Sequence, residues 1–146
     1  MNRIAFFLNF EPGPPTVTHQ EKKVRVANGR PVFYEPPSLK EARALLAAKV
    51  KPFAPPEPWD CPVMLCISWR FRIPASRRAV PGAGWVWKTT RPDLDNLRKL
   101  LQDVMTDCGF WKDDALLCSV VEEKKEYRAD QKHGILVSVT SLGDPP

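Results

Sequence analysis

Between Val63 and Ile73 every odd-numbered position is a large apolar residue, and these alternate with Met64, Cys66, Ser68, Arg70 and Arg72. This period of two predicts a half-buried strand, and its second face becomes basic at Arg70 and Arg72. The run Ile4–Phe10 is apolar and aromatic at both alternating sets of positions, so we expect an opening strand that lies inside a sheet.

The C-terminal third carries two more β patterns, at 116–127 and 134–142, and they predict a closing antiparallel strand pair. Near the N-terminus, Lys22–Tyr34 contains two short β-prone runs separated by Asn28-Gly29. This dipeptide favours a type I′ turn, so we expect a hairpin. Its basic residues would make it a positively charged flap: Lys22, Lys23, Arg25 and Arg30.

Two stretches have helical periodicity. The stronger one is a single apolar stripe with steps of three and four residues, and Gly109 follows it as a C′ residue. The stripe consists of Leu97, Leu100, Leu101, Val104, Met105 and Cys108. Asp95 or Asn96 would cap its start. The other helix is predicted from Ser38, where Ser38-Leu39-Lys40-Glu41 has capping-box spacing, to Val50 before Pro52.

The length of 146 residues and a hydrophobic content of 43% suit one packed core, so we expect a single domain over 1–146. Its flexible parts would be the basic hairpin at about 20–37 and a basic loop at about 74–90. No segment has the length of apolar sequence that a membrane span needs, and the N-terminus lacks signal-peptide features, which predicts a cytoplasmic protein. The cysteines lack zinc-site spacing and are expected to be buried free thiols: Cys61, Cys66, Cys108 and Cys118.

The net charge of +5 is unevenly distributed along the chain. Residues 1–92 contain fifteen Lys and Arg against six Asp and Glu, and residues 93–146 contain seven against eleven. A basic half beside an acidic pocket suits a protein that attracts a polyanion and also holds a cation. An ordinary solvated surface with a chance imbalance remains the alternative.

The acidic residues that point to chemistry are Asp93, Asp95 and Asp114. Pro92 disfavours helix at Arg91, so Asp93 and Asp95 are expected on the same side of an extended segment before the helix. Two carboxylates held that close repel each other unless a cation compensates, and a hard divalent ion such as Mg²⁺ is suited to this role. An antiparallel return of the chain after the helix would bring Asp114 back as a third ligand.

Lys99 follows Asp95 by four residues, one helical turn along the same face. There it would stabilise the charge that develops on a phosphate during cleavage. The alternative is a structural ladder of salt bridges that joins Asp95, Lys99 and Asp103, with little energetic value. An EF-hand loop is excluded, because Leu97 occupies its third ligand position and the glycine of that motif is missing.

The loop 74–90 combines basic residues with Trp85 and Trp87. Such a combination can bind sugar-phosphate and stack on unpaired bases. Both tryptophans could equally be strand or core residues. The basic residues of this loop and its flanks that would contact a nucleic acid in this way are Arg70, Arg72, Arg77, Arg78, Lys88 and Arg91.

The motifs Asp93-Leu94-Asp95-Asn96-Leu97-x-Lys99 and Gly109-Phe110-Trp111-Lys112-Asp113-Asp114 resemble those of the RusA family of Holliday-junction resolvases. Weaker similarity extends to Trp87-Lys88-Thr89, Glu123-Lys124-Lys125 and Gly134-Ile135. The N-terminal segment 12–16 departs from the family pattern, because it lacks the arginines that many relatives carry between such prolines.

This resemblance implies an α+β (mixed α/β) fold with one mixed sheet packed against two helices, assembled as a homodimer. It implies an endodeoxyribonuclease that binds four-way branched DNA and makes paired nicks with Mg²⁺, or with Mn²⁺ as a substitute. The catalytic residues would be Asp93, Asp95, Lys99 and Asp114, and the three acids would also be the metal ligands. Asp113 would be a neighbour of the site. The alternatives are a catalytically silent protein that binds branched DNA and a less selective branch or flap nuclease.

Overall fold

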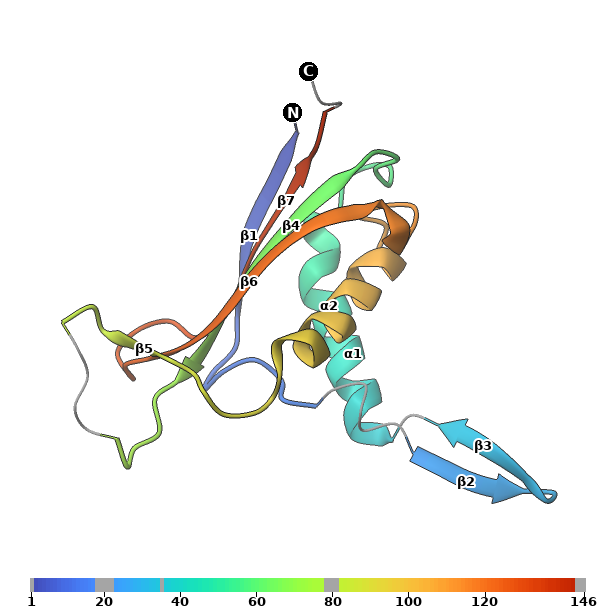
Figure 1. Ribbon diagram of the computed structural model, residues 1–146, viewed down its shortest axis with the longest axis horizontal. Coiled ribbons are helices and arrows are strands. Elements are labelled where there is room, and N and C mark those ends of the chain that lie inside the picture. The colour runs from blue at the N-terminus through green and yellow to red at the C-terminus, as the bar shows by residue number, and fades with distance from the viewer. Residues whose placement is uncertain (1, 18–22, 35, 78–81, 144–146) are drawn as a thin grey trace.

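Five strands form one mixed sheet, and two helices cover one of its faces (Figure 1). The sheet strands are β1 (Arg3–Asn9), β4 (Val63–Arg72), β5 (Trp85–Trp87), β6 (Leu117–Tyr127) and β7 (Gly134–Ser141). The helices are α1 (Pro37–Val50) and α2 (Leu94–Asp107), with short 3₁₀ turns η2 (Lys51–Phe53) and η3 (Asp114–Leu116). The computed structural model describes residues 2–17, 23–34, 36–77 and 82–143. The α+β class with one mixed sheet and two helices is confirmed.

The strand order in the sheet is β1-β7-β4-β6-β5. β4 pairs in parallel with β6, and the other neighbours are antiparallel. The core lies between the sheet and the helices, where the odd-numbered residues of β4 meet the apolar stripe of α2. Buried residues at this layer include Leu65, Trp69 and Leu101, so the alternation of β4 and the stripe of α2 are both confirmed.

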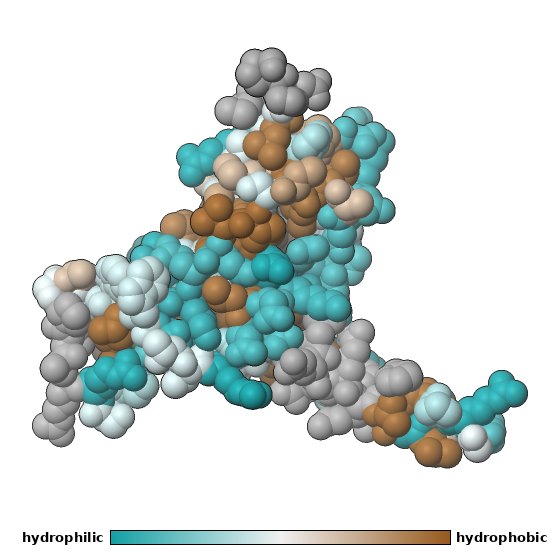
Figure 2. All heavy atoms as spheres, in the orientation of Figure 1, coloured by the Kyte–Doolittle hydropathy of each residue, from teal (hydrophilic) through white to brown (hydrophobic). Residues whose placement is uncertain are grey.

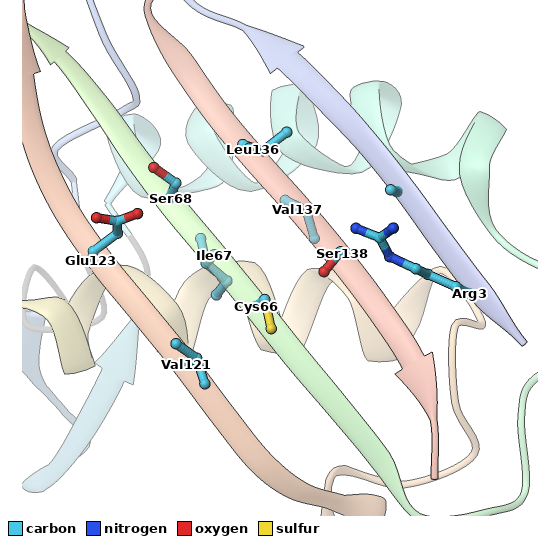
Figure 3. Close-up of a pocket in the computed structure, with 10 residues that line it drawn as sticks. Arg3, Cys66, Ile67, Ser68, Val121, Glu123, Leu136, Val137 and Ser138 are labelled. Carbon is cyan, nitrogen blue, oxygen red and sulfur yellow. The ribbon is translucent and has the colours of Figure 1, made fainter. Parts of the chain in front are cut away.

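The other face of the sheet carries no helix; we call it the open face. Figure 2 shows hydrophobic residues gathered over the part of the sheet where β1, β7 and β4 lie. A shallow cavity of about 370 Å³ lies on this face, and Figure 3 shows side chains that line it, with the helices behind the sheet. These side chains include Cys66, Ser68, Val121 and Leu136, with Arg3 on β1 and Glu123 on β6.

The predicted hairpin is also present, as β2 (Lys23–Ala27) and β3 (Arg30–Tyr34). Asn28 and Gly29 have φ values of 52° and 74°, as a type I′ turn requires. The hairpin forms its own two-stranded sheet and projects away from the five-stranded sheet and the helices (Figure 1). Lys22 lies outside the described residues.

The prediction that the last two strands pair with each other is wrong. β6 and β7 exist, but β4 lies between them, in parallel with β6 and antiparallel to β7. The connection 128–133 therefore crosses two inter-strand spacings, about 10 Å, which six residues span easily. The prediction that β1 lies inside the sheet is also wrong, because among the described residues it is an edge strand with β7 as its one partner strand. Gly134 permits this close pairing: a Cβ there would lie 1.9 Å from the carbonyl oxygen of Leu8.

Both helices begin earlier than their predicted caps. α1 begins at Pro37 after Pro36, and Ser38 lies within the helix without a capping bond. Proline suits the first helical position because its missing N–H would lack a partner in the helix there. α2 begins at Leu94 with Asp93 as its N-cap, so Asp95 lies in the first turn and not in an extended segment.

The cysteines are free thiols, as predicted, but none is fully buried and Cys118 is exposed. Burial raises the pKa of the half-buried Cys108 thiol. Among the described helices, none is long and apolar enough to cross a membrane.

Candidate active site at the start of helix α2

Two carboxylates flank the start of α2. Asp93 is its N-cap, with an extended backbone (φ −73°, ψ 149°), and its side chain accepts no capping hydrogen bond. Asp95 lies in the first turn, and both side chains are exposed. Neither carboxylate forms a hydrogen bond or ion pair with the residues that the structure describes. The N-terminus of a helix carries partial positive charge, which stabilises anions at this position.

Lys124 holds the loop that leads to these acids. Its ammonium group donates to the carbonyl oxygens of Thr90 (2.7 Å) and Pro92 (2.8 Å). The amide of Lys88 donates to the carbonyl of Lys124 (3.2 Å). The backbone just before Asp93 is therefore attached to β6 at three points, which fixes the start of α2 relative to the sheet.

Glu122 is a further carboxylate beside this site that sequence reasoning did not identify. Its side chain is only 8% exposed and forms an ion pair with Arg98 of α2, while the indole of Trp69 donates to its other oxygen (3.3 Å). Burial raises the pKa of Glu122; Arg98 and Trp69 act against this, and the nearby Asp95 carboxylate adds to it. The effect of Asp95 indicates that negative charge accumulates at the helix start. The sequence shows Glu122-Glu123 as a pair but does not show which of the two faces the helices.

Lys99 is exposed on the first turns of α2, and no ion pair joins it to Asp95 in the part of the chain that the structure describes. The salt-bridge alternative between these two residues is therefore not formed. The Lys99 ammonium group is available to a phosphate on this side of the helix.

Asp114 lies at the other end of α2. Its carboxylate accepts a hydrogen bond from the hydroxyl of Thr106, which in turn accepts one from the indole N–H of Trp111 (2.7 Å). Thr106 follows Asp95 by eleven residues, about 16 Å along the helix axis at 1.5 Å per residue. The expected return of Asp114 to the helix start is therefore wrong within one subunit. The described residues contain no group of three His, Cys, Asp or Glu side chains placed to hold a metal ion.

Asp113, next to Asp114, has a local structural role. It is the N-cap of η3, where its carboxylate accepts from the amide of Ala115 (2.7 Å). Within one subunit Asp113, like Asp114, lies at the end of α2 away from Asp93 and Asp95.

The residues expected to contact DNA differ in their surroundings. Arg77 and Lys88 both approach the buried Glu126, at 2.7 Å and 3.9 Å, and burial lowers the pKa of Lys88. Arg70 lies over the rings of Phe7 and Tyr127 (5.7 and 5.1 Å to the ring centroids). Arg72 and Arg91 are exposed, and Arg78 lies outside the described residues.

The two tryptophans of the loop lie in strand β5, which pairs with the end of β6. Trp87 is 58% exposed, so it is a strand residue but not a core residue. Trp85 is half-buried.

Comparison with known proteins identifies the family of this chain. The model of the family "Endodeoxyribonuclease RusA" matches residues 12–140. The chain is 30% identical over 141 residues to the "Crossover junction endodeoxyribonuclease rusA" of Lactococcus phage r1t, covering 95% of this chain and 100% of that protein. The matched region includes the carboxylates at the start of α2, Lys99 and Asp114. The chain therefore belongs to the RusA family of endodeoxyribonucleases.

Proposed function

We propose that this protein is a Mg²⁺-dependent, structure-selective endodeoxyribonuclease that resolves four-way DNA junctions by paired symmetric nicks. The observation that carries the proposal is the start of α2, where the carboxylates of Asp93 and Asp95 are exposed and form no hydrogen bond or ion pair with another described residue. Asp95 lies one helical turn from the exposed Lys99, in a chain of the RusA family. A structural cap would use the Asp93 side chain, and here the cap bond is missing.

The donor set at the helix start fits a hard divalent ion. Mg²⁺ takes one or two carboxylates and retains several waters, and Mn²⁺ accepts the same ligands. Asp93 and Asp95 would supply these oxygens, and the compensating charge would relieve the repulsion that extends to Glu122. A bound ion would supply Lewis-acid stabilisation to the phosphodiester under attack. Lys99 would stabilise the negative charge that develops on the phosphate oxygens.

A second copy of the chain would complete the site with Asp114. Strand β6 has two edges. One edge pairs with β4 along the whole strand, and the other pairs, among the described residues, only with β5 at Lys125–Tyr127. The rest of that edge, 117–124, has no partner strand among the described residues, and Val120 and Val121 on it are 37% and 60% exposed. An unpaired edge is a template for another strand.

Two copies that pair antiparallel along this edge would be related by a two-fold axis. The start of one β6 would then lie beside the end of the other, near Lys124, which anchors the loop before Asp93. The partner's Asp114 would thereby approach the start of α2, and the same contact would occur twice. The resulting homodimer has two equal sites, which suits a junction with approximate two-fold symmetry.

The experiment is incubation of the protein with a synthetic mobile four-way junction, with matched duplex and flap substrates, in Mg²⁺ or in EDTA. We expect paired nicks on the junction in Mg²⁺ alone. The Asp93→Asn variant should bind the junction within a few-fold of wild type but cut it about 100-fold or more slowly, because it loses a metal ligand. Lys99→Ala should be slower by about 100-fold at similar affinity.

Three results would contradict the proposal. Equal cutting of flaps and junctions would indicate a less selective branch nuclease. Tight binding of the junction by wild-type protein without cutting in Mg²⁺ or Mn²⁺ would indicate a silent binding protein. Cutting of the junction by Asp93→Asn at the wild-type rate would show that Asp93 is not needed for catalysis.

A further inference from the structure

Trp85, Trp87 and Lys125 form a cluster on the open face, at the end of the sheet where β5 pairs with β6. The Lys125 ammonium group lies 4.1 Å from the ring centroid of Trp85 and 5.0 Å from that of Trp87. The two indoles meet edge to face, with centroids 4.7 Å apart and an interplanar angle of 76°. Trp87 and Lys125 are cross-strand partners, so they share a face of the sheet.

These contacts hold Trp87 in place without burying it. Its side chain is 58% exposed, while Lys125 is held by an ion pair with Glu123 (2.6 Å). Burial of a large aromatic side chain contributes a large favourable free energy, and the Trp87 side chain remains largely in water. The cluster therefore presents an ordered aromatic surface to an incoming partner.

The charge next to the cluster favours a nucleic acid as that partner. Arg70 is the register neighbour of Lys125 on β4, and it forms no ion pair with the described residues; its guanidinium lies over the ring of Tyr127. A cation beside an exposed aromatic ring is the combination with which proteins bind unpaired nucleotides, the ring stacking on a base and the cation approaching a phosphate.

The cluster is also close to the acids along the chain. Asp93 follows Trp87 by six positions, which limits the distance between their Cα atoms to about 20 Å even in a fully extended chain. Lys124, the neighbour of Lys125, holds the loop between them. A branched DNA at the helix start would thus have its unpaired or distorted bases within reach of this edge.

We propose that Trp87, supported by Trp85 and Lys125, stacks on an unpaired nucleobase at the branch point of the DNA substrate. This inference rests on the proposed function. It assigns a binding role to Trp87 that is separate from hydrolysis, and it makes the cluster a determinant of selectivity for branched over fully paired DNA.

The test uses Trp87→Phe and Trp87→Leu as a matched pair, since phenylalanine keeps an aromatic face and leucine keeps only apolar area. Each protein is titrated in EDTA against a four-way junction with 2-aminopurine at the branch point, and against the same label within a duplex. A single-stranded oligonucleotide with the label is measured in parallel. We expect wild type and Trp87→Phe to quench the branch-point label. Trp87→Leu should fail to quench it and should lose about tenfold in junction affinity, with duplex affinity unchanged.

Equal losses for junction and duplex in Trp87→Leu, or unchanged quenching in that variant, would overturn the proposal. A shift of Trp87→Leu from dimer to monomer in light scattering would also overturn it, because the cluster would then be a protein interface. Failure of the proposed function is recognised separately: wild-type protein would not bind or nick the junction. In that case, quenching of the single-stranded probe by wild type but not by Trp87→Leu would still support base stacking by Trp87. If wild type does not quench this probe, base stacking by Trp87 is contradicted.

Discussion

At the scale of single residues, the completely buried His133 shows how one polar side chain joins distant segments. Its Nδ1 lies 2.5 Å from the carboxylate of Glu11, and its Nε2 lies 3.0 Å from the carbonyl oxygen of Arg128. Its backbone amide also donates to Glu11 (3.2 Å), and its carbonyl accepts from the amide of Phe10 (2.9 Å). The segment after β1 is thereby tied to the loop before β7.

This contact predicts a pH dependence of stability. The hydrogen bond from His133 lowers the pKa of Glu11 below its ordinary value of 4.5. A carboxyl group with a lowered folded-state pKa stabilises the protein above its unfolded pKa, and the contribution disappears as the pH falls through the folded value. Thermal unfolding should therefore give a Tm difference between wild type and Glu11→Gln that is larger at pH 6 than at pH 3. The exposed Glu57 provides the control: Glu57→Gln should leave Tm nearly unchanged at both pH values. Equal differences at both pH values for Glu11→Gln would contradict the account.

Residue spacing predicted only part of the candidate site. The positions of Asp95 and Lys99 on adjacent turns of one helix follow from their separation by four residues, and the structure has them there. Glu122 could not be predicted, because its place under α2 depends on the register between β4 and β6. The distance between Asp114 and the acids Asp93 and Asp95 could not be predicted either, because it depends on the direction in which the chain leaves α2.

At the scale of elements, α2 is the part of the fold that sequence reasoning described best. Its apolar stripe repeats at helical intervals, and the five stripe residues within the helix are buried. The pairing of strands was predicted less well, because alternation identifies a buried face but not a neighbour. β6 and β7 have the expected patterns, yet the insertion of β4 between them depends on long-range contacts that no local pattern encodes.

The packing of α2 gives a prediction on stability. Leu101 is fully buried between the helix and the sheet, so Leu101→Ala should lower the free energy of unfolding by about 2–5 kcal/mol. Leu45 of α1 is 47% exposed, and Leu45→Ala should cost less than about 1 kcal/mol. Urea denaturation followed by circular dichroism measures both. A cost for Leu101→Ala no greater than that of the control would show that this layer is not the core.

At the scale of the whole molecule, the free edge of β1 lies on the other side of the sheet from β6, so the surfaces compared for a second copy are the unpaired edge of β6 and the open face with its cavity. The edge is the better choice for the proposed homodimer. It has unpaired backbone groups, and antiparallel pairing there would join acids that a single subunit holds apart. The cavity of the open face is lined mainly by apolar side chains, and none of the three acids is among its lining residues.

The choice between these surfaces is tested by Val120→Lys on the edge and Leu136→Lys on the open face. The two side chains are similarly exposed, at 37% and 39%. A lysine on an edge strand opposes strand addition, so Val120→Lys should weaken the dimer by about tenfold or more, and Leu136→Lys should leave it intact. Analytical ultracentrifugation measures both dissociation constants. The reverse result would assign the dimer to the open face.

The most direct test of the central claim is complementation between two inactive variants, Asp93→Asn and Asp114→Asn, mixed in equal amounts and allowed to exchange subunits. If each site takes Asp93 from one subunit and Asp114 from its partner, every mixed dimer retains one intact site. The mixture should then recover about a quarter of the wild-type nicking in Mg²⁺, as single nicks in place of paired ones. If both acids acted within one subunit, no dimer would have an intact site, and a mixture as inactive as each variant alone would contradict the account.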